Sequence, residues 1–203
     1  MDTTSLDFKF KGSRTYVHGT DIYNAIIEYA REKMGLEDIS NIRYTLHKVM
    51  RTNLDMEIYI NERVPKKPET AVVFLCESGG AKYQFMLHEN HREITGRYEY
   101  DEDGIVKDCL LNREGQLLEL TDKTPYSDIE LIVAINKAMM NLLFPDGPGK
   151  WYFTKLELEK AVGKTDYSSI KTRLIRNLNF KLTKSEVFID GVLRGYIYFS
   201  SAV

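Results

Sequence analysis

The segment from residue 126 to residue 144, YSDIELIVAINKAMMNLLF, constrains the fold of this chain more than any other stretch. Its apolar residues recur on nearly every face of a helix, so we expect the helix to be largely enclosed by other elements. Ser127 as N-cap with Glu130 three residues later forms a capping-box signature at its start. Pro145 follows, and proline is not tolerated in a helix interior. The sequence therefore predicts one long, buried helix over Tyr126–Phe144.

An equivalent helix is predicted from Thr20 to about Met34. Thr20 is a suitable N-cap, Asp21 in the first turn favours the helix dipole, and Gly35 is a suitable C-terminal residue. The apolar positions follow helical spacing on one face, namely Ile22, Ala25, Ile26 and Tyr29. This helix has a polar face, unlike the one at 126–144.

Strand patterns follow both helices. Two turn signals indicate hairpins, Gly79-Gly80 and Asp190-Gly191. Residues 64–69 contain two prolines and indicate a hairpin tip. A bulge is expected near residues 177–179 of the longest strand. The predicted strands cover residues 8–17 with a kink, 42–50, 54–60, 71–76, 83–87, 93–100, 105–111, 117–120, 151–158 (alternatively passing into a short helix through Ala161), 169–182, 186–189 and 194–199.

The order strand, helix, several strands occurs twice. Thr20-Asp21-Ile22 opens the first helix and Ser127-Asp128-Ile129 opens the second. Residues 100–104 (YDEDG) form an acidic turn between the two sets and are the candidate linker. We therefore predict two tandem units, residues 1–103 and 104–203, packed as one domain.

Composition limits the classes of function. The chain has 203 residues, 43% of them hydrophobic and 29% charged, as in globular proteins. Its net charge of −2 gives no general attraction to nucleic acid or to an acidic membrane, and neither is expected as a partner. From Lys150 onward the chain contains ten Lys and Arg and five Asp and Glu, which is a net charge of +5. The preceding residues therefore carry a net charge of −7. This basic segment is either a solvated face or a docking surface for an acidic partner.

The sequence also carries expectations about location. The two cysteines, Cys76 and Cys109, have no metal-like spacing and suggest reduced thiols. No apolar run approaches the roughly 18 residues of a membrane span, and the N-terminus has no signal-peptide pattern. We therefore expect a cytoplasmic protein with no membrane partner.

Two segments resemble the hotdog fold. Residues 181–200, KLTKSEVFIDGVLRGYIYFS, are similar to the closing hairpin of hotdog acyl-thioester enzymes, where an Asp-Gly turn joins two strands. Residues 48–60, KVMRTNLDMEIYI, resemble the strand–turn–strand of that family, although residues 52–55 replace its usual Gly-Asp turn preceded by proline. The resemblance implies an α+β double hotdog, in which each long central helix is wrapped by a curved antiparallel sheet. The alternative is an ordinary α+β domain with two helices on one antiparallel sheet.

The resemblance also implies where chemistry occurs. In hotdog dehydratases and thioesterases the acyl thioester lies near the N-termini of the central helices, where backbone N–H groups polarise its carbonyl. His18 is then the candidate acid or base, with Asp128 or Glu130 as the second catalytic group. Substrate contacts are expected from Gly19, which lets a carbonyl approach the backbone, and from Thr20, Asp21 and Tyr126.

Each of these residues also has a structural interpretation. His18 can be a polar residue at a strand end, Asp21 and Asp128 can serve the helix dipole, and Glu130 can be half of a capping box. His88 and His91 have helical metal spacing but lie at a predicted turn, with no cysteine or third histidine nearby, so no metal site is expected.

The catalytic motifs of the resembled family are absent. Around His18 there is no following Phe and no downstream Pro-Gly before the helix, and the thioesterase pattern of Asp, Gly-His and paired Asn is also missing. Whether the chain is an enzyme is therefore open. The hypotheses are a hydro-lyase or thioesterase acting on acyl-CoA or on an acidic acyl carrier protein, a non-catalytic hotdog that binds a ligand or partner, and an unrelated α+β interaction module. No cofactor is expected, and the oligomer would be a monomer or a homodimer of double units.

Overall fold

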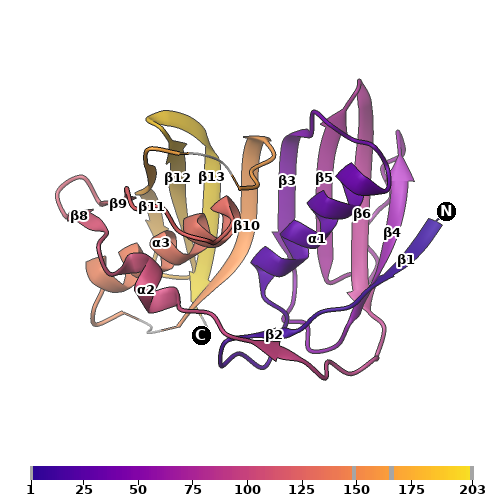
Figure 1. The fold of residues 1–203 in the computed structure, drawn as a ribbon, viewed down its shortest axis with the longest axis horizontal. Coiled ribbons are helices and arrows are strands. Elements are labelled where there is room, and N and C mark those ends of the chain that lie inside the picture. Colours follow the sequence, from indigo (N-terminus) through magenta and orange to yellow (C-terminus); the bar gives the residue numbers. More distant parts are fainter. Residues whose placement is uncertain (1, 148–149, 165–166, 202–203) are drawn as a thin grey trace. The chain divides into compact units, whose positions relative to one another are not determined.

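The computed structural model describes residues 2–147, 150–164 and 167–201. The chain divides into two compact units. Unit 1 comprises Met1–Tyr100 with Glu159–Ala161, and unit 2 comprises Asp101–Leu158 with Val162–Val203. In each unit one long helix lies against a sheet whose neighbouring strands are antiparallel (Figure 1).

Unit 1 has the sheet order β1-β4-β6-β5-β3, with α1 across one face (Figure 1). A separate pair of short strands, β2 and β7, is parallel. The elements are β1 (Asp2–Leu6), β2 (Phe10–Lys11), α1 (Gly19–Glu32), β3 (Ser40–Leu46), β4 (Leu54–Ile60), β5 (Val72–Ser78), β6 (Ala81–Glu89) and β7 (Arg97–Tyr98).

The core of unit 1 joins one face of α1 to the sheet. Tyr23 of α1 is fully buried and meets Tyr44 of β3 and Phe74 of β5 with ring centroids 5.9 Å apart. Phe74 contacts Phe85 of β6 edge-on at 5.8 Å. Such aromatic pairs contribute about 1 kcal/mol each beyond the area that they bury, so this cluster fixes α1 on the sheet.

Unit 2 has the sheet order β10-β13-β12-β11-β9-β8, and α3 contacts β9 and β11. A short helix, α2, packs on α3, where Lys137 pairs with Glu102 at 2.7 Å. The elements are α2 (Glu102–Val106), β8 (Leu110–Asn112), β9 (Leu117–Leu120), α3 (Asp128–Leu143), β10 (Trp151–Lys160), β11 (Ile170–Leu178), β12 (Leu182–Ile189) and β13 (Val192–Ser201).

The two long helices and the two tight hairpins were predicted correctly. α1 and α3 begin and end within about two residues of the predicted bounds. Gly79 and Gly80 both have positive φ, +57° and +81°, between β5 and β6. Asp190 and Gly191, at +52° and +75°, join β12 to β13 in the same way. Two successive positive φ values match the right-handed twist of the flanking strands.

The predicted strand over residues 105–111 is mostly wrong. Residues 102–106 form α2, because the Asp101 side chain accepts a hydrogen bond from Gly104 N at 2.8 Å and Ile105 is buried. Only Leu110–Asn112 is a strand, paired with β9 as the predicted hairpin requires. The apolar residue that suggested a strand is therefore the anchor of a helical turn.

The predicted long strand over residues 169–182 is two strands. The chain reverses at Asn179 and Phe180, both with positive φ, and β11 pairs with β12. The Phe180 ring packs against Phe144 at 5.2 Å and Trp151 at 6.0 Å, which holds an unusual backbone conformation for an aromatic residue. The register shift of β11 lies between Leu174 and Arg176, not near residues 177–179.

Residues 64–69 are not a hairpin tip. β4 and β5 are separated by β6, so the segment between them crosses β6. Gln84 of β6 holds it through hydrogen bonds with Val64 N (3.1 Å) and Val64 O (2.7 Å), and Lys67 pairs with Glu57 at 2.9 Å. The prolines mark a crossing connection rather than a turn.

The predicted strand over residues 8–17 is also misplaced. β1 ends at Leu6, and only residues 10–11 of the predicted range are a strand. Among the described strands β1 lies at the edge of the sheet and pairs with β4, and such an edge position tolerates the polar sequence DTTSL. Residue Lys11, in β2, is fully buried.

Candidate functional site

The N-terminus of α1 is built on His18. His18 is the N-cap, with extended backbone, and its carbonyl oxygen accepts from Asp21 N at 3.0 Å and Ile22 N at 3.3 Å. The prediction that Thr20 is the N-cap is therefore wrong. Thr20 lies in the first turn, fully buried, because its hydroxyl serves a side-chain network instead of the helix end.

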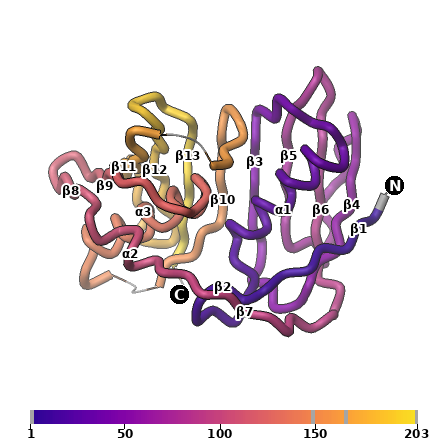
Figure 2. Tube along the Cα trace, viewed as in Figure 1, coloured from indigo at the N-terminus to yellow at the C-terminus, as the bar shows by residue number. Residues whose placement is uncertain are grey.

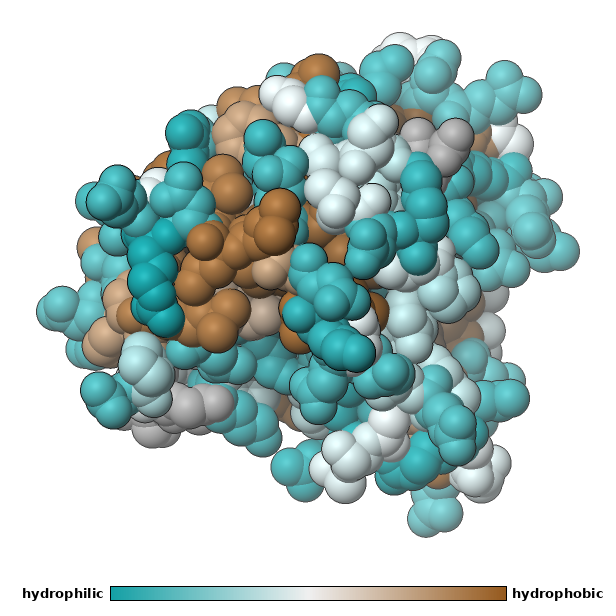
Figure 3. All heavy atoms as spheres, turned by 60° about the vertical axis from the view of Figure 1, so that its left-hand side comes forward, coloured by the Kyte–Doolittle hydropathy of each residue, from teal (hydrophilic) through white to brown (hydrophobic). Residues whose placement is uncertain are grey.

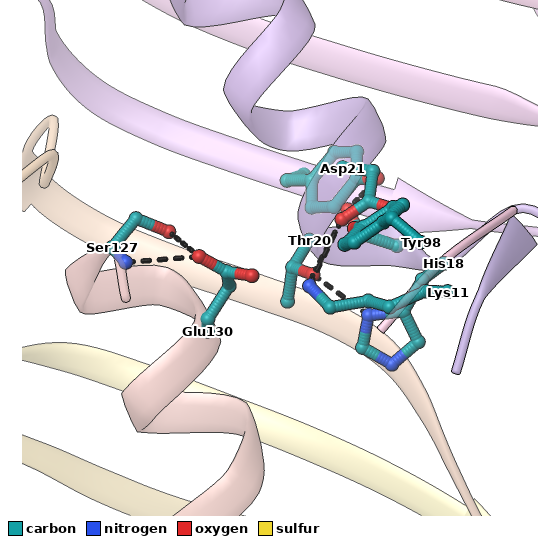
Figure 4. A network of polar contacts seen from close by, with 9 residues as sticks. Lys11, His18, Thr20, Asp21, Tyr98, Ser127 and Glu130 are labelled. Atoms are coloured by element: carbon teal, nitrogen blue, oxygen red, sulfur yellow. Dashed lines mark hydrogen bonds and ion pairs between the residues drawn. The ribbon is translucent and has the colours of Figure 1, made fainter. Parts of the chain in front are cut away.

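That network, the α1 cluster, comprises Lys11, His18, Thr20, Asp21 and Tyr98 (Figure 4). Thr20 Oγ1 lies 2.7 Å from His18 Nδ1 and accepts from Lys11 Nζ at 3.0 Å. Lys11 Nζ also pairs with Asp21 Oδ1 at 3.0 Å, and Tyr98 Oη donates to Asp21 Oδ2 at 2.7 Å. The cluster thus links three elements around the first turn of α1.

Lys11 and Tyr98 reach the helix through the parallel pair of β2 and β7. Figure 2 shows the two short strands side by side, and the register places Lys11 opposite Tyr98. The Lys11 ammonium also lies 4.3 Å from the centroid of the Tyr100 ring, within the range of a cation–π interaction. Sequence reasoning missed all three residues, because the pairing joins segments far apart in the chain.

Tyr44 fixes the backbone at the start of the helix. Its hydroxyl donates to Gly19 O at 2.8 Å. Burial, then the negative charge of Asp21 and the neighbouring Tyr23, raise the pKa of Tyr44 well above 10.0. Tyr44 is therefore a permanent donor, and Gly19 is held where the first N–H groups of α1 have no carbonyl of the helix to bond.

The α1 cluster restricts the chemistry of His18, whose side chain is 7% exposed. Lys11 can only donate, so Thr20 Oγ1 accepts from it and has one proton to give. If that proton goes to Asp21 Oδ1, 3.3 Å away, His18 Nδ1 donates to Thr20 and Nε2 of the neutral ring is a base. If it goes to His18 Nδ1, Nε2 carries the ring proton and is a hydrogen-bond donor. The direction of the Thr20–His18 hydrogen bond therefore decides which tautomer the neutral ring adopts.

The N-terminus of α3 has a different arrangement. Ser127 is the N-cap, and Glu130 Oε2 accepts from its backbone N at 2.9 Å and its hydroxyl at 2.7 Å (Figure 4). This confirms the predicted capping box. Asp128 is fully buried, with its backbone N donating to Gly163 O at 2.6 Å. The Tyr126 hydroxyl accepts from Asp101 N at 3.2 Å.

The predicted site residues thus form two groups, each within its own unit. His18, Gly19, Thr20 and Asp21 lie together in unit 1, and Tyr126, Asp128 and Glu130 lie together in unit 2. A catalytic pair of His18 with Asp128 or Glu130 stays a prediction.

Within residues 2–147, 150–164 and 167–201, no group of three or more His, Cys, Asp or Glu could hold a metal ion. No helix in the same residues is long and apolar enough to cross a membrane.

Comparison with solved structures identifies the fold. The dehydratase domain of a mycocerosic acid synthase-like polyketide synthase matches with a TM-score of 0.51 and 9% identity, over 93% of this chain and 83% of that chain. A proposed thioesterase from Novosphingobium aromaticivorans matches with a TM-score of 0.50 and 8% identity, over 99% of this chain and 95% of that chain. No protein-family model and no curated protein sequence matches. The chain therefore has the hotdog fold in two tandem units, as the resemblance predicted.

Proposed function

We propose that this protein binds an acyl thioester at the N-terminus of α1 and that His18 exchanges a proton with it, as a hydro-lyase or a thioesterase does. The observation that carries the proposal is the double role of His18. It is the N-cap of α1, and its ring is fixed through Nδ1 by Thr20 at 2.7 Å. An acid–base group is thus attached to the first turn of a helix.

The electrostatics of the cluster support this role. The first N–H groups and the positive end of a helix dipole stabilise negative charge that develops on a thioester carbonyl oxygen. The fully buried Lys11 ammonium adds a positive charge, and its pairing with Asp21 makes that charge tolerable in the interior. The fold is shared with a dehydratase domain, which makes thioester chemistry the first class to test.

A second candidate function is ligand binding without catalysis. Glu130 is engaged in the capping box, and Asp128 is fully buried. Both groups that could complete a catalytic pair therefore have local structural roles. A protein with one proton-exchanging group and no second would bind the acyl thioester and leave it unchanged.

The basic face of unit 2 supports an anionic carrier as the source of the acyl group. Lys171, Arg173 and Lys184 lie on neighbouring strands near aromatic rings. Arg173 pairs with Glu186 at 2.5 Å and Lys171 lies 3.9 Å from Glu119, so these carboxylates neutralise part of the positive charge. Lys184 Nζ lies 3.7 Å from the centroid of the Tyr196 ring. An acidic acyl carrier protein, or the phosphates of acyl-CoA, would complement these cations.

The test uses a panel of acyl-CoA thioesters with the intact protein and with His18→Asn. Asparagine preserves an N-cap and a partner for Thr20 but cannot exchange a proton at neutral pH. We expect binding to persist and turnover, measured as thiol release or hydration, to fall at least about 100-fold. His88→Asn, in β6, is the matched control and should change neither.

The outcomes separate the candidates. Equal turnover in His18→Asn would remove His18 from the mechanism. Binding by the intact protein without any turnover would favour the non-catalytic function. Failure of every thioester to bind would reject both.

A further inference from the structure

The contacts of the α1 cluster converge on the hydroxyl of Thr20 (Figure 4). Among the described residues, Thr20 Oγ1 has three polar neighbours, Lys11 Nζ at 3.0 Å, His18 Nδ1 at 2.7 Å and Asp21 Oδ1 at 3.3 Å. Thr20 is fully buried, so these neighbours determine where its proton points. A hydroxyl has one proton to donate and two lone pairs that accept. All three contacts are therefore hydrogen bonds only if Thr20 donates to one neighbour and accepts from the other two.

Two of the three neighbours have a fixed role. The Lys11 ammonium can only donate. Asp21 is the carboxylate that pairs with Lys11 at 3.0 Å, and a carboxylate can only accept. The hydroxyl proton of Thr20 therefore belongs to Asp21 Oδ1. Thr20 then accepts from His18, so Nδ1 of the imidazole carries a proton.

The opposite direction leaves one contact unsatisfied. If Thr20 donated to His18 Nδ1, no proton would lie between Thr20 Oγ1 and Asp21 Oδ1, which are 3.3 Å apart. Two oxygen atoms would then face each other through their lone pairs, one of them on a negatively charged group. Such an unpaired contact is costly inside a protein, where the local dielectric constant is low. Only the first arrangement makes all three contacts favourable.

The start of α3 does not repeat this cluster. Aligning Asp21 with Asp128 places Ser127 at the position of Thr20 and Pro125 at the position of His18. Proline has no group that exchanges a proton, and the Ser127 hydroxyl donates to Glu130 at 2.7 Å. The orientation of a histidine by a hydroxyl is therefore a property of unit 1 and not a general consequence of the repeated fold.

We infer that Lys11 and Asp21 orient the Thr20 hydroxyl so that it accepts from His18 Nδ1–H, which leaves Nε2 of the neutral ring without a proton. Thr20 is thus a positioning residue that acts through His18. The catalytic meaning of this inference rests on the proposed function, and it specifies how the reaction begins.

His18 starts the reaction as a base. Its Nε2 forms a bond to a proton of a water that attacks the thioester, or to a proton of the carbon next to the carbonyl group. The electron pair of the broken O–H or C–H bond stays on that oxygen or carbon.

The same hydrogen bonds serve the ring after it has taken the proton. In the imidazolium both nitrogens carry protons, and Nδ1 still donates to Thr20. The hydroxyl does not have to rotate, so the cluster is preorganised for both states of His18. A ring with its proton on Nε2 would instead have to take the second proton at Nδ1, where the Thr20 hydroxyl lies 2.7 Å away.

The tautomer is measured by ¹⁵N NMR of the histidine ring nitrogens in the free protein. The pH is chosen so that the His18 ring is neutral by its own titration, and His18→Asn identifies its signals. We expect the Nδ1–H form to exceed the Nε2–H form about tenfold, the ratio that one net hydrogen bond gives. His91, an exposed residue, is the internal reference. No thioester is needed, so this result is independent of the proposed function.

Two variants of Thr20 test its positioning role. Thr20→Val keeps the shape of the side chain and removes the hydroxyl, so the preference for Nδ1–H should be lost. With an acyl-CoA substrate, kcat should fall about tenfold and KM should not change, because the base is less often in its reactive form. Thr20→Ser restores the hydroxyl and should restore both the tautomer and kcat. The signals of His91 should respond to neither variant.

A parent protein with the His18 proton on Nε2 would overturn the inference, and so would an unchanged tautomer ratio in Thr20→Val. If Thr20→Val does not fold, as judged by circular dichroism, the tautomer of the parent and of Thr20→Ser decides. If Nδ1 carries the proton and no acyl-CoA is turned over, the direction of the hydrogen bond is supported, whereas the catalytic function and the role of His18 as a base are rejected.

Discussion

At the scale of single residues, the buried charge of Lys11 is the feature with the strongest consequences. Its side chain is 0% exposed and that of its partner Asp21 is 15% exposed. A buried ion pair contributes little net stability, but breaking it leaves one charge unpaired. The α1 cluster is therefore sensitive to any change that removes one partner.

Replacing Lys11 with Met should lower the free energy of unfolding by about 3 kcal/mol, because Asp21 loses its counter-ion inside the protein. Urea denaturation followed by circular dichroism measures the change. The double variant Lys11→Met with Asp21→Asn should recover part of the loss. Asp7→Asn, which breaks the exposed pair with Arg92, is the control and should change stability by less than about 1 kcal/mol. An equally small effect of Lys11→Met would contradict the buried pair.

Glu89 provides a test of pH dependence. Burial acts to raise the pKa of its carboxyl, but hydrogen bonds from Arg51 N at 2.6 Å and Thr52 N at 3.1 Å outweigh it and lower the pKa below 4.5. A lowered pKa means that the carboxylate stabilises the fold above its unfolded-state pKa, and that this contribution is lost as pH falls through the folded-state value.

Glu89→Gln should therefore cost about 1 kcal/mol at neutral pH, and the difference from the parent should shrink as the pH drops below about 4. Thermal unfolding at a series of pH values measures it. Glu28→Gln, at an exposed position of α1, is the control. If the stability difference between the parent and Glu89→Gln instead grows toward low pH, folding raises the pKa of Glu89 and does not lower it.

Part of the candidate site was predicted from the sequence. The hotdog resemblance, applied to the predicted start of the first helix, named His18, Gly19 and Asp21, and the capping-box pattern located Glu130. Lys11 was not found. Its burial depends on the pairing of β2 with β7, which joins residues 10–11 to residues 97–98.

At the scale of elements, a glycine in β13, Gly195, allows this strand to lie very close to the backbone of β10. Gly195 has a φ of +150°, and a Cβ at this position would lie 1.9 Å from the carbonyl oxygen of Glu157 in β10. Gly191 also has positive φ but has open space around it. The two glycines separate the effect of backbone conformation from that of close approach.

Gly195→Ala should destabilise the protein by at least about 2 kcal/mol, because strands β10 and β13 must separate to admit the methyl group. Gly191→Ala should cost about 1 kcal/mol, the penalty of a left-handed conformation alone. Chemical denaturation of both variants tests the order. If Gly191→Ala proves the more damaging, the close contact between β10 and β13 is not decisive.

At the scale of the whole molecule, one supersecondary unit is repeated, but the exposed apolar side chains are not spread evenly over the surface. Apolar side chains gather on the side of unit 2 that carries β8 and β9 (Figure 3). Leu110 of β8 is 63% exposed, and Leu142, Ile175 and Leu178 are also exposed. β8 is the last strand of the described sheet of unit 2, and an exposed apolar edge favours association.

We expect the protein to self-associate through this edge as a homodimer, and Leu110→Lys to shift it to the monomer. Sedimentation velocity over a range of concentrations measures the change. Ile60→Lys, at an exposed position of unit 1, is the control and should leave the association unchanged. A monomeric parent at all concentrations would reject the interface.

Local sequence patterns were sufficient to predict the two long helices, the two tight hairpins and the order in which these elements recur. These features depend on residues within a few positions of one another, such as the Ser127–Glu130 capping box and the Asp190-Gly191 turn. The tertiary fold accounts for the other features. It replaced a predicted strand with α2, reversed the chain at Phe180, buried Lys11 against the first turn of α1 and left the Asn136 amide without a partner among the described residues. Each of these depends on groups distant in the chain that meet only after folding, and local patterns carry no information about them.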